Sequence, residues 1–218
     1  MKSITSEWLV ILRSNLESIT REAALNHWPG STPDNPPYFN YRLEHVLQVE
    51  RDAMRLMESI GGDEEVILAS VWIHDRFQPQ YMNNNHPAEA EQWAREHLAS
   101  LGFPEDKVEA VCYCVANHSN PPGAIPEDEE DARILWDADI LSKVGAVSIA
   151  AFMCGIPAFP DKIIGFREIA KFGTDTTELY TDLPDSFYFD ISRIWAKKRL
   201  EAQMAFYNDL AREVGLVN

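Results

Sequence analysis

One stretch of eight residues, 66–73, constrains the fold of this chain more than any other. It reads Val-Ile-Leu-Ala-Ser-Val-Trp-Ile, so a helix built from it is apolar on nearly all sides. A helix of this kind is stable only when other helices surround it. Elsewhere apolar residues recur at helical spacing, and no segment alternates as a half-buried strand does. The sequence therefore predicts an all-α protein, a compact multi-helix bundle with residues 63–76 as its central helix.

Helix-stopping sequences divide the rest of the chain. The predicted helices cover residues 4–27, 40–60, 63–76, 87–101, 104–117, 129–152 and 185–214. Loops are expected at residues 28–40, 119–131 and 173–184, and no element is assigned between 155 and 184. Because the 218 residues contain no linker and no repeat, we expect one domain over 1–218. Its core is expected at about 38–153, with helices 4–27 and 185–214 packed on it.

Charge and cysteine content narrow the functional classes. The formal net charge is −16, which repels a phosphate backbone, so non-specific nucleic-acid binding is not expected. No apolar run reaches the roughly 18–20 residues that span a bilayer, and the N-terminal segment has no export signal. Cys112, Cys114 and Cys154 form no disulfide framework and are predicted to be reduced core thiols in a cytoplasmic protein. A homo-oligomer is compatible with these features.

The residues able to do chemistry are histidines and acids among apolar neighbours. His74 and Asp75 directly follow the apolar stretch 66–73, so both emerge from buried surroundings. A buried carboxylate needs a partner, which is either a cation or a base such as Arg76. His45 lies between apolar residues of the second predicted helix. Each residue alone has a structural explanation, whereas the set indicates a metal site.

The order His45, His74-Asp75, Asp139 resembles the H…HD…D signature of the HD superfamily of metal-dependent phosphohydrolases. The pattern extends over most of the chain. The resemblance implies an all-helical HD domain with the metal site in the centre of its bundle.

Two shorter motifs refine the resemblance. Arg42 stands three residues before the first histidine, similar to the R-x-x-H of several members. Residues 138–141 are similar to the family's A-D-x-L, which favours Asp139 over the nearby Asp137 as the ligand. Residues 137–146 and 196–206 look like the uncharacterised YedJ-like branch, from which Ile140 and Ser142 depart.

Two more histidines fall where binuclear members place extra ligands. His86 opens a predicted helix and His118 ends one, so the alternatives are a loop residue and a helix-capping residue. His27 and His97 match nothing in the pattern and are expected to be surface or structural residues. The metal ligands implied are His45, His74, Asp75, His86, His118 and Asp139.

Charge favours two ions over one. One divalent ion with two carboxylates is neutral, whereas two ions with a bridging hydroxide keep one positive charge, which attracts phosphate. Asp75 would bridge the ions; His45, His74 and Asp139 would hold one ion, and His86 with His118 the other. Imidazole and carboxylate ligands suit manganese, iron, cobalt, nickel or zinc better than magnesium.

The resemblance implies a phosphohydrolase acting on a small phosphorylated substrate. It would cleave a phosphate ester or anhydride of a nucleotide or small metabolite with a metal-activated hydroxide. Arg42 and Lys143, which is four residues after Asp139, either contact phosphate oxygens or are solvated surface charges. Two alternatives stay open: a di-iron oxygenase with the same ligands, and a non-catalytic helical binding module with a structural metal.

Overall fold

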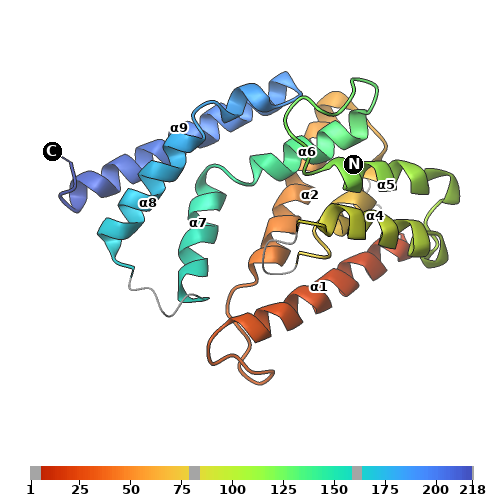
Figure 1. The fold of residues 1–218 in the computed structure, drawn as a ribbon, viewed down its shortest axis with the longest axis horizontal. Helices are drawn as coiled ribbons and strands as arrows, with labels where there is room; N and C mark the ends of the chain where they lie inside the picture. Colours follow the sequence, from red (N-terminus) through yellow and green to blue (C-terminus); the bar gives the residue numbers. More distant parts are fainter. Residues whose placement is uncertain (1–5, 79–83, 159–163, 218) are drawn as a thin grey trace. The chain divides into compact units, whose positions relative to one another are not determined.

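The computed structural model describes residues 6–78, 84–158 and 164–217 (Figure 1). These residues form helices and loops without a strand, which confirms the all-α prediction. The α-helices of the described residues are α1 (Glu7–His27), α2 (Tyr41–Ile60), α3 (Glu64–Ile73), α4 (His86–His97), α5 (Val108–Asn117), α6 (Glu130–Leu141), α7 (Ala146–Gly155), α8 (Phe166–Leu179) and α9 (Asp190–Glu213). Residues 4 and 5 of the first predicted helix lie outside the described residues.

The chain divides into two compact units, residues 1–139 and 140–218. Each is described by itself, and the single-domain organisation stays a prediction. Among the described residues, no single helix combines the length and apolar content of a membrane span, although α6 and α7 taken together as a bent pair do.

Helix α3 is the centre of the first unit, as its sequence predicts. All residues of the stretch 66–73 are buried, and α3 packs against α1, α2 and α5. Asp63 caps its start, because the side-chain oxygen accepts hydrogen bonds from the amides of Glu65 (3.0 Å) and Val66 (3.2 Å). The cap and the apolar surroundings together fix where the helix begins, and its C-terminal end delivers His74 and Asp75.

The prediction of one helix over residues 129–152 was wrong. Helix α6 ends at Leu141 and α7 begins at Ala146. Gly145, between them, has a φ of +92°, which side chains other than glycine rarely adopt. A Cβ added there would lie 2.8 Å from Cβ of Arg199. The apolar pattern continues through this turn, so periodicity alone does not reveal it.

The second unit contains a helix that the sequence analysis did not assign. Helix α8 packs along α9 (Figure 1) and includes the first part of the expected loop 173–184. Gly173 serves close packing, since a Cβ added there would lie 2.0 Å from the ring of Tyr207. Helix α9 begins at Asp190 rather than at 185, because Leu183–Ser186 forms a separate 3-10 turn.

Candidate metal centre

The residues of the H…HD…D series lie on helices α2, α3 and α6 of the first unit or directly after them. His45 lies in α2, and Asp139 lies in α6. His74 caps the C-terminus of α3, and its amide donates to the carbonyl of Ser70 at 2.9 Å. Helix α3 thus ends three residues earlier than predicted, and Asp75 lies in the following turn. All four side chains are shielded, with exposed fractions from 0% for His74 to 7% for His45.

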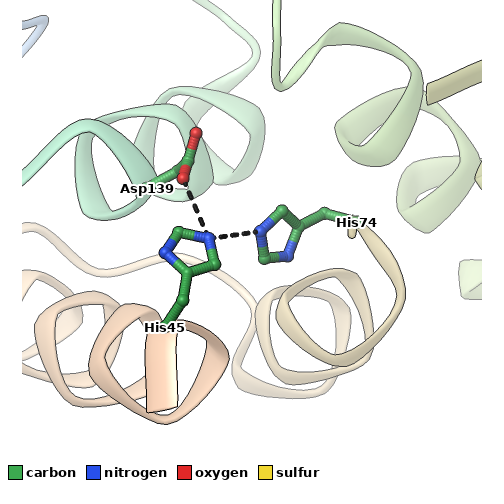
Figure 2. A group of neighbouring side chains, drawn as sticks. All are labelled: His45, His74 and Asp139. Carbon is green, nitrogen blue, oxygen red and sulfur yellow. Dashed lines mark hydrogen bonds and ion pairs between the residues drawn. The ribbon is translucent and has the colours of Figure 1, made fainter. Parts of the chain in front are cut away.

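His45, His74 and Asp139 form the first group able to hold a metal ion. Nε2 of His45 lies 3.3 Å from Nε2 of His74 and 3.3 Å from Oδ1 of Asp139. Figure 2 shows the three side chains pointing toward one another from separate segments, with His45 linked to both others.

Asp75, His86 and His118 form the second group. His86 is the first residue of α4, and His118 follows the last residue of α5. Their Nε2 atoms lie 3.0 Å apart, and Oδ1 of Asp75 lies 3.4 Å from Nε2 of His86 and 3.9 Å from that of His118. The two histidines that were expected as extra ligands therefore lie together with Asp75.

Asp75 also faces the first group with its other oxygen. Oδ2 lies 3.2 Å from Nε2 of His45 and 3.5 Å from Nε2 of His74. One carboxylate thus stands between the two groups, with one oxygen directed at each. This is the placement that a ligand shared by two ions needs.

Hydrogen bonds to the backbone orient two of the imidazoles. Nδ1 of His74 lies 2.7 Å from the carbonyl of Val71, and Nδ1 of His118 lies 2.6 Å from the carbonyl of Val115. A carbonyl oxygen only accepts, so each Nδ1 carries a proton, and in the uncharged form of each ring the lone pair of Nε2 faces its group. Burial holds the pKa of His74 well below its ordinary value, which keeps the ring in this neutral form.

The two groups fit divalent cations. Each collects lone pairs and carboxylate oxygens that repel one another unless a positive charge lies between them. Ligand atoms about 2.0–2.2 Å from a shared ion lie about 3–3.6 Å apart, and nearly all the separations described above fall in that range. The assignment of these residues as ligands stays a prediction.

Arg42 lies beside the groups, not at the surface. It is 6% exposed, and its guanidinium donates to Oδ2 of Asp75. Burial lowers the pKa of Arg42. The buried partner of Asp75 is therefore Arg42, whereas Arg76 forms no ion pair within the described residues.

Two other candidates, Lys143 and Asp137, lie outside both groups. Lys143 was placed one turn beyond Asp139 on the same helix, but α6 ends at Leu141, and Lys143 lies exposed in the following turn. Its contact with phosphate stays a prediction. Asp137 is fully buried and belongs to neither group, so the geometry agrees with the preference for Asp139.

Ser119, which has no role in the predicted site, contacts His118. Its Oγ lies 3.1 Å from Nε2 of His118, close enough to donate to the lone pair that faces the second group. Serine is too common beside a histidine for its position to indicate this contact. The orienting carbonyls of Val71 and Val115 were also missed, because every residue carries a carbonyl.

Comparison with known proteins assigns the fold. Residues 42–144 match the family model of the HD domain. An uncharacterized protein of Clostridium beijerinckii is 26% identical over 111 residues, which cover 49% of this chain and 68% of that protein.

Solved structures resemble almost the whole chain. YpgQ of Bacillus subtilis, in complex with ADP, is 19% identical with a TM-score of 0.61 and covers 94% of this chain and 96% of its own. A Lactobacillus plantarum protein is 20% identical with a TM-score of 0.64, over 98% and 100% of the two chains. A predicted HD superfamily hydrolase from an uncultured Thermotogales bacterium is 20% identical with a TM-score of 0.57, over 93% and 92%. These proteins share the fold.

The matched segment contains Arg42 and every residue of the two groups. The segment also contains the H…HD…D series itself, His45, His74-Asp75 and Asp139. Residues 42–144 of the chain therefore form an HD domain.

Proposed function

We propose that this protein is a metal-dependent phosphohydrolase that cleaves a phosphate ester or anhydride of a nucleotide or another small phosphorylated metabolite. The observation that carries the proposal is the placement of Asp75, whose two oxygens face two separate groups of ligand atoms. Two cations held a few ångströms apart are a recurring arrangement in phosphatases and nucleases. The ADP in the YpgQ structure supports a nucleotide as the phosphorylated substrate.

The donor atoms divide into two sets around the shared carboxylate. His45, His74 and Asp139 would hold one ion, His86 and His118 the other, and Asp75 both. Bound divalent ions would lower the pKa of coordinated water toward 7 and make a nucleophile available at neutral pH. Because nitrogen donors outnumber carboxylates, manganese, iron, cobalt, nickel or zinc fits the site better than magnesium.

Arg42 has two effects in this arrangement. Its buried guanidinium donates to Asp75 and so holds the carboxylate between the two groups. It also adds a positive charge beside the place where the phosphoryl group would bind, which favours an anionic transition state. Arg42 is therefore a positioning residue that also strengthens the field on the substrate.

The test combines metal analysis of the purified full chain with a phosphate-release screen. Nucleotides and sugar phosphates are offered with each candidate metal, and nucleotide products are separated by chromatography. We expect hydrolysis that falls at least about a hundredfold in Asp75→Asn and His86→Ala, because even residues that only orient a metal ligand are worth about 10- to 100-fold. His27→Ala removes an imidazole that lies outside both groups and is the matched control.

Wild-type rates in Asp75→Asn would reject the phosphohydrolase. Bound iron with oxygen consumption and no phosphate release would indicate an oxygenase instead. Bound metal without either reaction would indicate a binding module in which the metal is structural.

A further inference from the structure

Arg76 is a half-buried arginine that directly follows Asp75. Its amide donates to the carbonyl of Ile73 at 2.9 Å, which holds the backbone in the turn after α3. Its guanidinium carbon lies 4.0 Å from the centre of the Trp93 ring. A cation–π contact of this kind holds the guanidinium over the ring without using its N–H donors.

Those donors have no oxygen partner among the described residues. The other three arginines of the first unit that are shielded from solvent each donate to one: Arg13 to Glu50, Arg42 to Asp75 and Arg133 to the carbonyl of Ile125. Asp75, the nearest carboxylate in sequence, is directed at Arg42 and at the histidines. Residues 79–83, outside the described part of the chain, contain no carboxylate in their sequence.

An unpaired, half-buried cation is unexpected in this chain. Acidic residues number 35 against 19 basic ones, so a carboxylate is the commonest charged neighbour that a guanidinium would find. Partial burial costs hydration that a counter-charge normally offsets. A guanidinium held over an aromatic ring, with N–H donors that bind no protein oxygen, matches the two oxygens of a phosphate.

The place of Arg76 separates it from the two ligand groups. Trp93 follows His86 by seven residues on α4, which puts both on the same face about two turns apart. The two side chains therefore leave the helix on the order of 10 Å apart, which is more than one phosphate group spans. We propose, on the basis of the proposed function, that Arg76 binds a phosphate of the substrate other than the one at the metal centre, so that the site prefers nucleoside di- and triphosphates to monophosphates.

The test measures equilibrium binding of two probes to the manganese-loaded full chain by calorimetry. The probes are AMP and α,β-methylene-ADP, which keeps the second phosphate and resists cleavage between the two. In Arg76→Gln we expect binding of the methylene analogue to weaken about tenfold, which is about 1.4 kcal/mol, while AMP binding changes less than about twofold. Arg76→Lys keeps the charge but loses the planar fork, so its loss is expected to be intermediate.

Arg13→Gln is the matched control. Arg13 also lies over a tryptophan, with its guanidinium carbon 5.4 Å from the centre of the Trp72 ring, but its Nη2 already donates to Glu50. The substitution removes the same charge and the same kind of cation–π contact, so it should leave the binding of both probes unchanged.

Three results would overturn the inference: unchanged analogue binding in Arg76→Gln, equal weakening of both probes, and an equal effect in Arg13→Gln. If Arg76→Gln does not fold, the same comparison in Arg76→Lys decides. Arg76-dependent binding without any phosphate release by the wild type would leave this inference standing and reject the proposed function. Hydrolysis of ADP at the same rate in the wild type and in Arg76→Gln would support the proposed function and reject this inference.

Discussion

Asp75 directs one oxygen at each ligand group, so a single substitution tests whether the groups share it. In Asp75→Asn the side chain keeps its shape, loses its charge and retains only one acceptor atom. His86→Ala removes a donor from the second group alone. The two variants should therefore differ in how strongly added manganese stabilises the fold.

The size of the effect follows from mass action. An ion present at 100 times its Kd stabilises the folded state by about 2.7 kcal/mol, so two sites contribute about 5 kcal/mol. For a chain of 218 residues each kcal/mol raises Tm by about 2–4 °C. Manganese should thus raise the Tm of the wild type by roughly 10–20 °C, that of His86→Ala by about half as much, and that of Asp75→Asn by less than about a quarter.

The assay is thermal unfolding followed by circular dichroism, in chelator and then in graded manganese. The shift is compared rather than the absolute Tm, because Asp75→Asn leaves Arg42 buried without its carboxylate, at a cost of about 3–5 kcal/mol before any metal is added. His27→Ala should show the full wild-type shift. An Asp75→Asn protein that keeps half of that shift or more would refute the shared carboxylate.

Two further predictions concern the metal-free protein. Burial holds the pKa of His74 well below its ordinary value, so the unfolded chain takes up a proton that the folded chain excludes. The free energy of unfolding should therefore fall as pH drops below about 6.5, by at most about 1.4 kcal/mol per pH unit for this residue. Urea titrations between about pH 7.5 and 5 should show that it depends less steeply on pH in His74→Gln than in the wild type. Equal dependence on pH in the two proteins would contradict the role of His74. Gly173→Ala places a Cβ 2.0 Å from the Tyr207 ring and should lower the free energy of unfolding by about 1–3 kcal/mol. Gly155→Ala meets no atom within 4 Å and should change it by less than about 1 kcal/mol, so equal urea midpoints for the two variants would show that α8 does not pack on α9 as described.

The sequence predicts the helices whose signals are local. Helix α3 carries its own cap in Asp63 and an apolar surface on all sides, and both are visible in the sequence. The turn at Gly145 depends instead on the close approach of Arg199, more than fifty residues away in the chain. Helix α8 was missed for the same reason, because Gly173 is explained only by the ring of Tyr207.

For the candidate site, residue types and spacing go further than secondary structure. The six implied ligands all fall into the two groups. Asp139 is a member of the first group, whereas Asp137 belongs to neither. Spacing does not reveal which side chains contact one another or where a helix ends. It therefore shows neither that Arg42 binds Asp75 nor that α6 ends before Lys143. Both depend on how the chain turns between residues.

The two carbonyls that orient His74 and His118 belong to the main chain of Val71 and Val115. Replacing either valine with another apolar side chain would leave these acceptors in place, so the tautomers are insulated from most point mutations. These hydrogen bonds also restrict rotation of both rings, so coordination of a cation costs less rotational freedom than it would for freely rotating imidazoles. Side chains that pack around these helices can therefore be substituted during evolution without changing the orientation of the two imidazoles.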